Sequence, residues 1–260
     1  MPAKYDSIGI GYNRTRQADP YLTDRLYALL DPVEKNHYLD VGCGTGNYTL
    51  ALHQRSVQLT GVDPSEKMLQ EARNKSNAIE WISGQVENLP FEDRTFDGAI
   101  ATLTMHHWQD IEQGLKEICR VLKKDSRLVL FTSTPTQMKG YWLNHYFPVM
   151  METSTRQMPA LELVTSGLEN NGFTIMEMER YFVKEDLKDL FLQSGKHNPM
   201  LYFTTEVRSG ISSFAALSNR EEVTKGLDRL AQDIETGHVK KVIEEYDSDE
   251  GDYLFIVAGT

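Results

Sequence analysis

A short run of glycines, Gly42–Gly46 (Gly-Cys-Gly-Thr-Gly), is the segment best suited to holding a cofactor. It follows the stretch His37–Val41, whose apolar pattern is typical of a strand, and precedes the helix-like stretch Asn47–Arg55. Glycine permits positive φ and lets a ligand approach the backbone closely. The run therefore predicts a cofactor loop; a plain tight turn between a strand and a helix is the alternative.

The spacing of these glycines argues against a dinucleotide cofactor. A dinucleotide fingerprint needs glycines at its first, third and sixth positions, and Asn47 stands at the sixth position counted from Gly42. An NAD-dependent oxidoreductase is therefore disfavoured. Asp63 lies about 20 residues beyond Gly42, where an acidic side chain can accept hydrogen bonds from both hydroxyls of a ribose. An Asp before a Pro is often only a turn or helix cap, but this spacing favours the binding role.

Further short motifs occur at intervals along the first half of the chain. With the glycine run they are Tyr38–Gly46, Gly61–Ser65, Gly84–Phe91, Phe96–Ile100 and Ile118–Leu122. Together they resemble the class I S-adenosylmethionine-dependent methyltransferases, in particular the small-molecule branch that includes enzymes of ubiquinone and menaquinone biosynthesis. The resemblance covers roughly residues 5–135 and returns at the last two strands. It implies S-adenosyl-L-methionine as the cofactor.

The resemblance also assigns residues to the methionine and ribose parts of the cofactor. It implies that Asp40, Gly42 and Gly44 surround the methionine part, and that Asp63 holds the ribose.

For the adenine, the resemblance points to the segment after the third strand. Gln85 stands where relatives often have an Asp beside the adenine amino group, and an amide oxygen can still accept that N–H. The backbone N–H of Val86 is expected to face an adenine ring nitrogen. The backbone of Thr102, just after the fourth strand, is expected near the cofactor's ammonium group.

The N-terminal segment resembles the opening segment of the same family. There Tyr12 and Arg16 are expected to close over the cofactor and meet its carboxylate, an interaction that suits the guanidinium fork. A solvated basic turn is the alternative.

Two adjacent histidines, His106 and His107, follow the fourth strand at the edge where doubly wound sheets bind ligands. A neutral imidazole at this edge can accept a proton from the methyl acceptor, so both are candidate catalytic residues. The alternative is that one packs structurally while the other contacts the substrate passively.

Aromatic residues gather between residues 134 and 158. Tyr141, Trp142 and Tyr146 are candidates for the wall of the acceptor pocket, and they equally suit the apolar core of a cap. A mixture of the two roles is expected, because a cap needs apolar contacts of its own.

The periodicity of apolar residues predicts alternating strands and helices, hence a parallel sheet covered on both faces. With the resemblance, this gives a doubly wound, Rossmann-like α/β sheet of about seven strands, mostly parallel with the last strand antiparallel. The chain is interpreted as one domain, with residues 134–158 and 186–250 forming a helical cap. Strands are expected at His37–Val41, Val57–Val62, Ala78–Ile82, Phe96–Ala101, Arg127–Phe131, Phe173–Val183 and Tyr253–Ala258. Helices are expected at Asn47–Arg55, Ser65–Lys75, Ile111–Leu122, Ala160–Glu169, Asp186–Gln193 and Glu221–Glu235.

Composition narrows the class of partner. The 27 basic and 38 acidic side chains give a formal charge of −11, which disfavours nucleic acid because phosphate backbones are repelled. Only two cysteines occur, Cys43 and Cys119, so neither a disulfide framework nor a cysteine-rich metal site is expected. The chain lacks a secretory signal and an apolar run of about 18 residues, so the cytoplasm is expected and membrane insertion is not.

The function predicted from the sequence is methyl transfer to a small-molecule acceptor, with no resident metal. A non-catalytic S-adenosylmethionine-binding module on the same fold is the alternative. The sequence carries no signal for the acceptor atom or for the oligomeric state.

Overall fold

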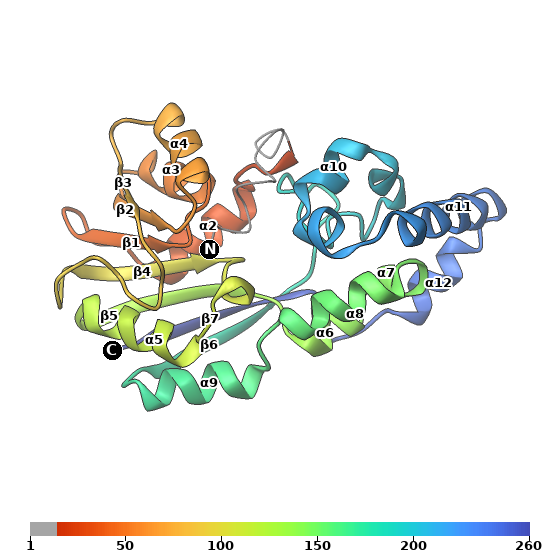
Figure 1. Cartoon of the computed structure of the whole chain (residues 1–260). Coiled ribbons are helices and arrows are strands. Elements are labelled where there is room, and N and C mark those ends of the chain that lie inside the picture. The colour runs from red at the N-terminus through yellow and green to blue at the C-terminus, as the bar shows by residue number, and fades with distance from the viewer. Residues whose placement is uncertain (1–14) are drawn as a thin grey trace.

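In the computed structural model, residues 15–260 form a sheet with helices on both faces and a further group of helices beside it (Figure 1). The strands are β1 (His37–Val41), β2 (Gln58–Asp63), β3 (Glu80–Ser83), β4 (Phe96–Thr102), β5 (Leu122–Thr132), β6 (Thr174–Tyr181) and β7 (Tyr253–Gly259). The main helices are α2 (Pro20–Leu30), α3 (Asn47–His53), α4 (Glu66–Lys75), α5 (Ile111–Val121), α6 (Pro135–Lys139), α7 (Leu143–Tyr146), α8 (Pro148–Gln157), α9 (Leu161–Asn170), α10 (Thr205–Gly210), α11 (Arg220–Thr236) and α12 (Val239–Glu245).

The sheet has seven strands in the order β3-β2-β1-β4-β5-β7-β6. The five strands from β3 to β5 are parallel, and β7 pairs in the antiparallel sense with both β5 and β6. The predicted fold class is therefore confirmed, including the antiparallel last strand. Each predicted strand is present. Ser65 is the N-cap of α4, since its side chain accepts a hydrogen bond from the Met68 backbone N–H.

The order of the strands reverses between β1 and β4. The chain runs outward from β1 to β2 and β3, then returns to β4 on the other side of β1. In open α/β sheets, ligands bind outside the carboxyl ends of the strands at such a switch point. Because β1 ends at Val41 and β4 at Thr102, the glycine run and the segment 103–108 meet at this edge.

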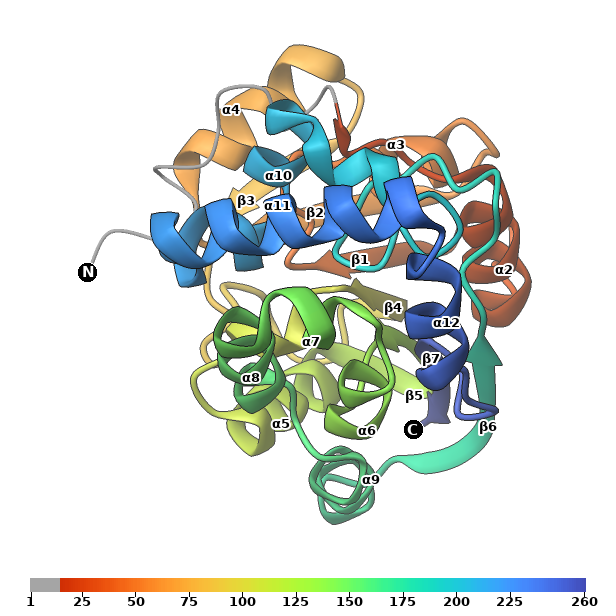
Figure 2. The same ribbon diagram turned by 90° about the vertical axis from the view of Figure 1, so that its right-hand side faces the viewer.

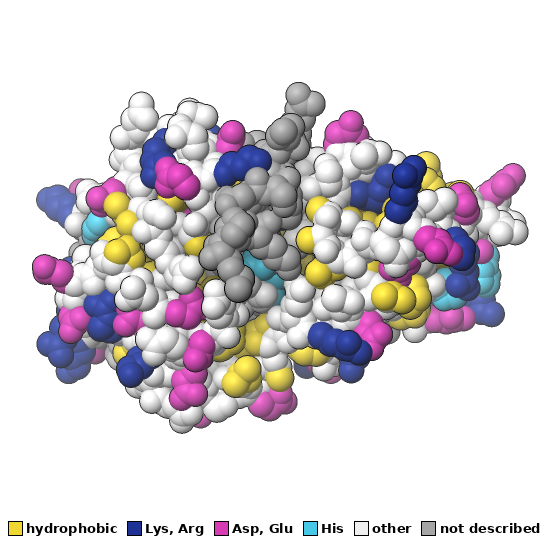
Figure 3. Space-filling model, viewed as in Figure 1, with side chains coloured by type: hydrophobic (Ala, Val, Ile, Leu, Met, Phe, Trp, Pro, Cys, Tyr) yellow, Lys and Arg dark blue, Asp and Glu magenta, His cyan; other side chains and the backbone are white. Residues whose placement is uncertain are grey.

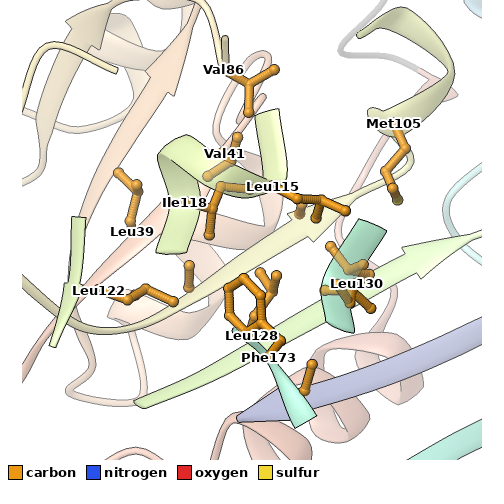
Figure 4. Packing of buried hydrophobic residues seen from close by; sticks show 14 of the residues in the cluster. Leu39, Val41, Val86, Met105, Leu115, Ile118, Leu122, Leu128, Leu130 and Phe173 are labelled. Carbon is orange, nitrogen blue, oxygen red and sulfur yellow. The ribbon is translucent and has the colours of Figure 1, made fainter. Parts of the chain in front are cut away.

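Strand side chains alternate between two apolar cores. Leu39 and Val41 belong to the core shared with α5 and α9, whereas Tyr38 belongs to the core shared with α2 and α3. This alternation is the two-residue period of a strand buried on both faces. Figure 4 shows the first core, in which Leu115 and Ile118 of α5 lie close to the strand side chains. The two cores fix the carboxyl ends of the strands against both helical layers.

A third apolar cluster lies beside the sheet and joins the two segments expected to form the cap. It includes Leu143 and Met150 from the first segment, and Val207 and Leu230 from the second. Figure 2 shows α11 passing across the side of the molecule that faces the viewer, with α7 directly below it. Short helical turns, η2 (Met105–His107), η3 (Pro199–Phe203) and η4 (Ser213–Leu217, a π-helical turn), complete the chain. Residues 134–158 and 186–250 are called the cap below.

One predicted helix is wrong. Residues 186–193 form no helix, and two of their backbone donors bind the N-terminal segment instead of the preceding turn. The N–H of Lys188 donates to Asp19 Oδ2 and that of Leu190 to the carbonyl of Thr15, both at 2.9 Å. Apolar spacing alone predicts a helix here, since it carries no information on these long-range partners.

Within residues 15–260, no helix combines the length and apolar character needed to cross a membrane. Basic and acidic side chains are interspersed on the face of the molecule shown in Figure 3.

Candidate active site

A cavity of about 780 Å³ lies at the switch point and extends to the cap. One wall, called the sheet-side wall, comes from residues 40–48, 62–68, 84–87 and 102–109. The opposite wall, called the cap-side wall, comes from residues of α6, α8, the segment 189–192 and residues 211–213. Among the predicted site residues, the following line the cavity: Arg16, Asp40, Gly42, Gly44, Asp63, Gln85, Val86, Thr102, His106 and His107. Tyr12 lies outside the described residues.

The glycine run forms the bend between β1 and α3. The N–H groups of Gly42 and Cys43 both donate to the carbonyl of Val62, which ties the loop to the end of β2. Gly42 has φ +70°, and a Cβ there would lie 2.1 Å from Thr104 Oγ1, so packing excludes a side chain. Gly44 has φ +55°, but a Cβ there would meet nothing within 4 Å. The loop therefore presents bare backbone toward open space at Gly44.

The carboxylate of Asp63 is fixed at the end of β2. The N–H of Gly44 donates to Oδ2 at 2.9 Å, and the N–H of Ser65 donates to Oδ1 at 2.8 Å. Only 8% of Asp63 is exposed, and it lines the cavity. A carboxylate can accept several hydrogen bonds, and this one faces the space where a ligand hydroxyl would lie. Asp63 thus both holds the glycine loop and offers acceptor atoms beside Gly44.

Asp40, the next-to-last residue of β1, is a buried acid on the same wall. Burial raises the pKa of its carboxyl to about 7; the hydroxyl of Thr49, which donates to Oδ2 at 2.6 Å, lowers it, and the charge of Asp63 raises it. Loss of hydration destabilises the charged form of a buried acid. A cation next to Asp40 would favour its ionised form.

The segment after β3 is a turn held by two backbone hydrogen bonds. The N–H of Gly84 donates to the carbonyl of Asp63 at 3.2 Å, and the carbonyl of Gln85 accepts from Asn88 at 3.1 Å. Val86 is buried in the core beneath α5. Gln85 and Val86 therefore lie at fixed positions on the cavity wall, next to Asp63.

The end of β4 carries a strained residue that the sequence did not indicate. Leu103 has φ +53°, a conformation that side chains other than glycine rarely adopt, and its N–H donates to the carbonyl of Phe131 at 2.8 Å. Thr102, next to it, has a buried hydroxyl with no hydrogen-bond partner. Both line the cavity. Strain of this kind gathers at ligand-binding sites, where the surrounding fold maintains it.

The two candidate catalytic histidines lie together in η2. The ring centroids of His106 and His107 are 3.8 Å apart, with the planes inclined at 51°. Both rings belong to the cavity wall, and each has a polar or ring contact within the protein. The structure thus brings an imidazole pair to the sheet-side wall, at the side nearest the cap-side residues.

Arg16 forms an ion pair that links both walls. Its Nε lies 2.5 Å from Asp189 Oδ1, and its Nη2 lies 3.2 Å from Oδ2. Asp189 comes from the cap, and its side chain is 2% exposed. The predicted alternative of a solvated basic turn does not match this geometry, because the guanidinium is largely buried.

Comparison with known proteins gives the family. Residues 39–130 match the family model described as a methyltransferase domain. The chain is 30% identical to a demethylmenaquinone methyltransferase of Staphylococcus aureus, over 72% of this chain and 78% of that protein. The chain also resembles a protein of Anabaena variabilis whose crystal structure is described as a methyltransferase from an antibiotic biosynthesis pathway. The two are 34% identical in sequence, and their structures superimpose with a TM-score of 0.84 over 95% of this chain and 99% of that one.

The chain belongs to the class I S-adenosylmethionine-dependent methyltransferases. It is also 29% identical over 237 residues to the biotin biosynthesis bifunctional protein BioHC of Cellvibrio japonicus. That alignment covers 86% of this chain but 45% of the relative, so the chain spans about half the length of that protein.

The cavity wall fits the cofactor of this methyltransferase family. Gly44 leaves room for a ligand against the backbone, and the fixed carboxylate of Asp63 beside it suits a ribose diol. The buried carboxyl of Asp40 suits a neighbouring cationic group. Within the described residues, no cluster of three or more His, Cys, Asp or Glu side chains could hold a metal ion.

Three residues predicted for the acceptor pocket lie in the apolar cluster of the cap. Tyr141, Trp142 and Tyr146 are buried in the apolar cluster of the cap, and none of the three is among the described residues that line the cavity, so a role in the acceptor pocket stays a prediction. Their polar atoms are engaged inside the cap: Tyr141 Oη lies 2.5 Å from Tyr202 Oη, and Trp142 Nε1 donates to a backbone carbonyl at 3.3 Å. Their size and apolar surface make them the core of the cap.

The cap-side wall uses residues that the sequence did not single out. From the cap, its members are Met138, Ser154, Gln157, Met158, Asp189, Phe191, Leu192, Ile211, Ser212 and Ser213. No one of these residue types indicates a binding site by itself, and the residues come from segments that are distant in sequence. Only the packing of the cap brings them together opposite the cofactor loop.

Proposed function

We propose that this chain transfers the methyl group of S-adenosylmethionine to a small-molecule acceptor bound between the sheet-side and cap-side walls. The observation that carries the proposal is the continuity of one cavity from Gly44 and Asp63 to Ser154 of α8 and to Met158, which follows α8. Methyl transfer needs the cofactor and the acceptor in the same space, and a cavity shared by the cofactor loop and the apolar cap provides it. In this proposal, residues 134–158 and 186–250 act as the acceptor-binding cap of a single domain.

The proposed cofactor contacts follow the order of the sheet-side wall. Asp63 accepts hydrogen bonds from the ribose hydroxyls, and the bare backbone at Gly44 lies against the amino-acid part. Gln85 and the Val86 N–H face the adenine, and the Thr102 backbone faces the ammonium group. The ionised form of Asp40 is favoured by the positive charge of the cofactor.

When bound, the sulfonium cofactor supplies a methyl group that its positive charge already activates for displacement. The chain's contribution is to hold the acceptor in line and to exclude water, since a well-oriented pair of reactants gains about 7–11 kcal/mol over a bimolecular encounter. His106 or His107 accepts a proton from the acceptor where that acceptor must lose one. Both imidazoles line the cavity, which supports this role.

The cap-side wall favours an acceptor with an apolar body and a polar group. Met138, Met158 and Phe191 supply apolar surface, while Ser154 and Ser213 supply hydroxyls. The relatives named for demethylmenaquinone and for biotin biosynthesis support a small metabolite. A quinone precursor and a small polar metabolite both match this mixture of groups.

Replacing Asp63 with Ala tests the cofactor site directly. Hydrogen bonds to a charged group contribute about 1.5–3 kcal/mol, so Asp63→Ala is expected to weaken S-adenosylhomocysteine binding roughly ten- to a hundredfold, measured by titration calorimetry. Asp93→Ala serves as the control, because Asp93 is an exposed carboxylate outside the cavity wall. Unchanged affinity in Asp63→Ala would show that the ribose site is assigned wrongly.

A panel of phenolic, quinol, amine and carboxylate acceptors then tests transfer itself. Release of S-adenosylhomocysteine with one class of acceptor is expected. Cofactor binding without transfer to any class would favour the non-catalytic binding module.

A further inference from the structure

The cap meets the N-terminal segment at a junction beside the cavity. Three polar links join residues 15–19 to residues 188–190: the N–H of Leu190 donates to the carbonyl of Thr15, the N–H of Lys188 donates to Asp19 Oδ2, and Arg16 pairs with Asp189. The first two links each have a backbone N–H as the donor and measure 2.9 Å, and they hold the segments side by side. The third joins two side chains that both line the cavity.

The Asp189 carboxylate is buried and bound from two sides. The guanidinium of Arg16 approaches it with Nε and Nη2, and the hydroxyl of Tyr48 donates to the same Oδ2 at 3.1 Å. Burial and the charge of Asp189 raise the pKa of Tyr48 well above its ordinary value, so Tyr48 remains a neutral donor. These contacts leave the plane of the guanidinium little freedom to rotate.

The other end of Arg16 is tied to the cofactor loop. Its carbonyl accepts from Asn47 Nδ2 at 2.9 Å, and Asn47 is the first residue of α3, directly after the glycine run. Asn47 is fixed in turn by Lys75, whose Nζ donates to Asn47 Oδ1 at 2.6 Å. The backbone of Arg16 is thus bonded to the residue that follows the cofactor loop, while its guanidinium is held by Asp189 of the cap.

A free arginine side chain samples many rotamers, and a planar fork that is already held in place loses less conformational entropy when a ligand binds. Resting on the proposed function, we propose that Asp189 is a positioning residue that orients the Arg16 guanidinium toward the carboxylate of the cofactor's amino-acid part. The cap then belongs to the cofactor site as well as to the acceptor site. Phe191 and Leu192, which follow Asp189 on the cap-side wall, are set by the same contact.

Two ligands separate this role from a general structural one. S-adenosylhomocysteine carries the amino-acid carboxylate, whereas 5′-methylthioadenosine keeps the nucleoside and the sulfur but lacks that group. Asp189→Asn keeps the size of the side chain and removes its charge. It is expected to weaken S-adenosylhomocysteine binding roughly tenfold, the size of one charge-assisted hydrogen bond, and to change 5′-methylthioadenosine binding less than about twofold.

Asp19→Asn is the matched control. Asp19 links the same two segments but does not line the cavity, and Asn caps α2 about as well as Asp. This variant is expected to leave the ratio of the two affinities unchanged. If Asp189→Asn proves poorly folded by thermal unfolding, Arg16→Lys supplies the same test, because lysine keeps the charge and loses the fork.

Equal weakening of both ligands by Asp189→Asn, or no weakening of either, would overturn the positioning role. These outcomes remain distinct from failure of the proposed function. If Asp63→Ala weakens both ligands while Asp189→Asn and Arg16→Lys weaken neither, the cofactor site stands and this inference fails. If the unmodified protein binds neither ligand, the proposed function itself fails.

Discussion

The sheet-side wall of the cavity takes its groups from the ends of neighbouring strands, whereas the cap-side wall takes them from helices and an irregular segment. On the sheet side, the parallel register of β1 and β2, which sets Asp40 opposite Gly61, brings Asp40 and Asp63 to the same edge of the sheet. On the cap side, Ser154 and Asp189 meet only because the third apolar cluster brings distant segments together. Apart from the Arg16–Asp189 pair, the proposed cofactor contacts thus depend on local backbone geometry, whereas the proposed acceptor contacts depend on tertiary packing.

The largest effect is expected from emptying the core of the cap. Trp142→Ala is expected to lower the free energy of unfolding by about 3–5 kcal/mol, because a large buried aromatic leaves a cavity. The sheet-side wall is built from strand ends and not from the core of the cap. We therefore expect the S-adenosylhomocysteine affinity of the folded variant to stay within about twofold of that of the unmodified protein. Urea unfolding and calorimetry measure the two quantities. Loss of cofactor affinity in a folded Trp142→Ala protein would remove the distinction between the walls.

A pH effect is expected on the sheet side alone. Because the folded pKa of Asp40 is raised to about 7, from an ordinary value of 3.8, the folded state holds an extra proton between these values. The unbound protein therefore loses stability as pH rises from about 4 to 7, by on the order of 2–4 kcal/mol.

Asp40→Asn removes that titration and serves as the comparison. Urea unfolding at pH 5 and pH 7.5 should show a smaller pH-dependent loss in Asp40→Asn than in the unmodified protein. Equal losses in both proteins would show that Asp40 does not carry the effect.

The smallest effect is expected from single hydroxyls of α8. Ser154 and Thr155 are neighbours with buried hydroxyls that have no hydrogen-bond partner, but only Ser154 lines the cavity. Ser154→Ala is expected to raise the acceptor KM by up to roughly tenfold, the contribution of one hydrogen bond. Thr155→Val, which keeps the shape of the side chain, is expected to leave KM unchanged.

Steady-state kinetics with the acceptor found in the transfer assay checks this pair. The same KM in both variants would mean that the Ser154 hydroxyl does not touch the acceptor. Neither variant should lose stability, since an unpaired buried hydroxyl is itself unfavourable.

The comparison of the walls also explains which features could be predicted from sequence. The strand His37–Val41 and the glycine run are encoded by neighbouring residues, so their positions follow from local pattern. The residues predicted on the sheet side, from Asp40 to His107, do line one cavity, although their roles stay predictions. Leu103 could not be predicted, because its positive φ is imposed by the pairing of β4 with β5.

The cap was predicted less well for a physical reason. Burial on several sides makes its helices apolar without a clear period, and the aromatic Trp142 suits a pocket wall and a core equally well. The prediction of a helix at 186–193 failed because two backbone donors of this segment have partners 169 and 175 residues away, at Asp19 and Thr15. Asp189 gave no signal for the same reason, since its partner Arg16 is 173 residues distant.

The position of β7 between β5 and β6 has a consequence for the order of assembly during synthesis. In the described sheet, β6 touches no strand other than β7, which is made about 70 residues later, after most of the cap. On a ribosome, β1 to β5 can pair as they emerge, while β6 must wait with the cap attached to it. The geometry of the glycine loop can therefore be established before the cap-side wall is complete. A chain stalled before residue 253 would have the glycine loop in place but an incomplete cap-side wall.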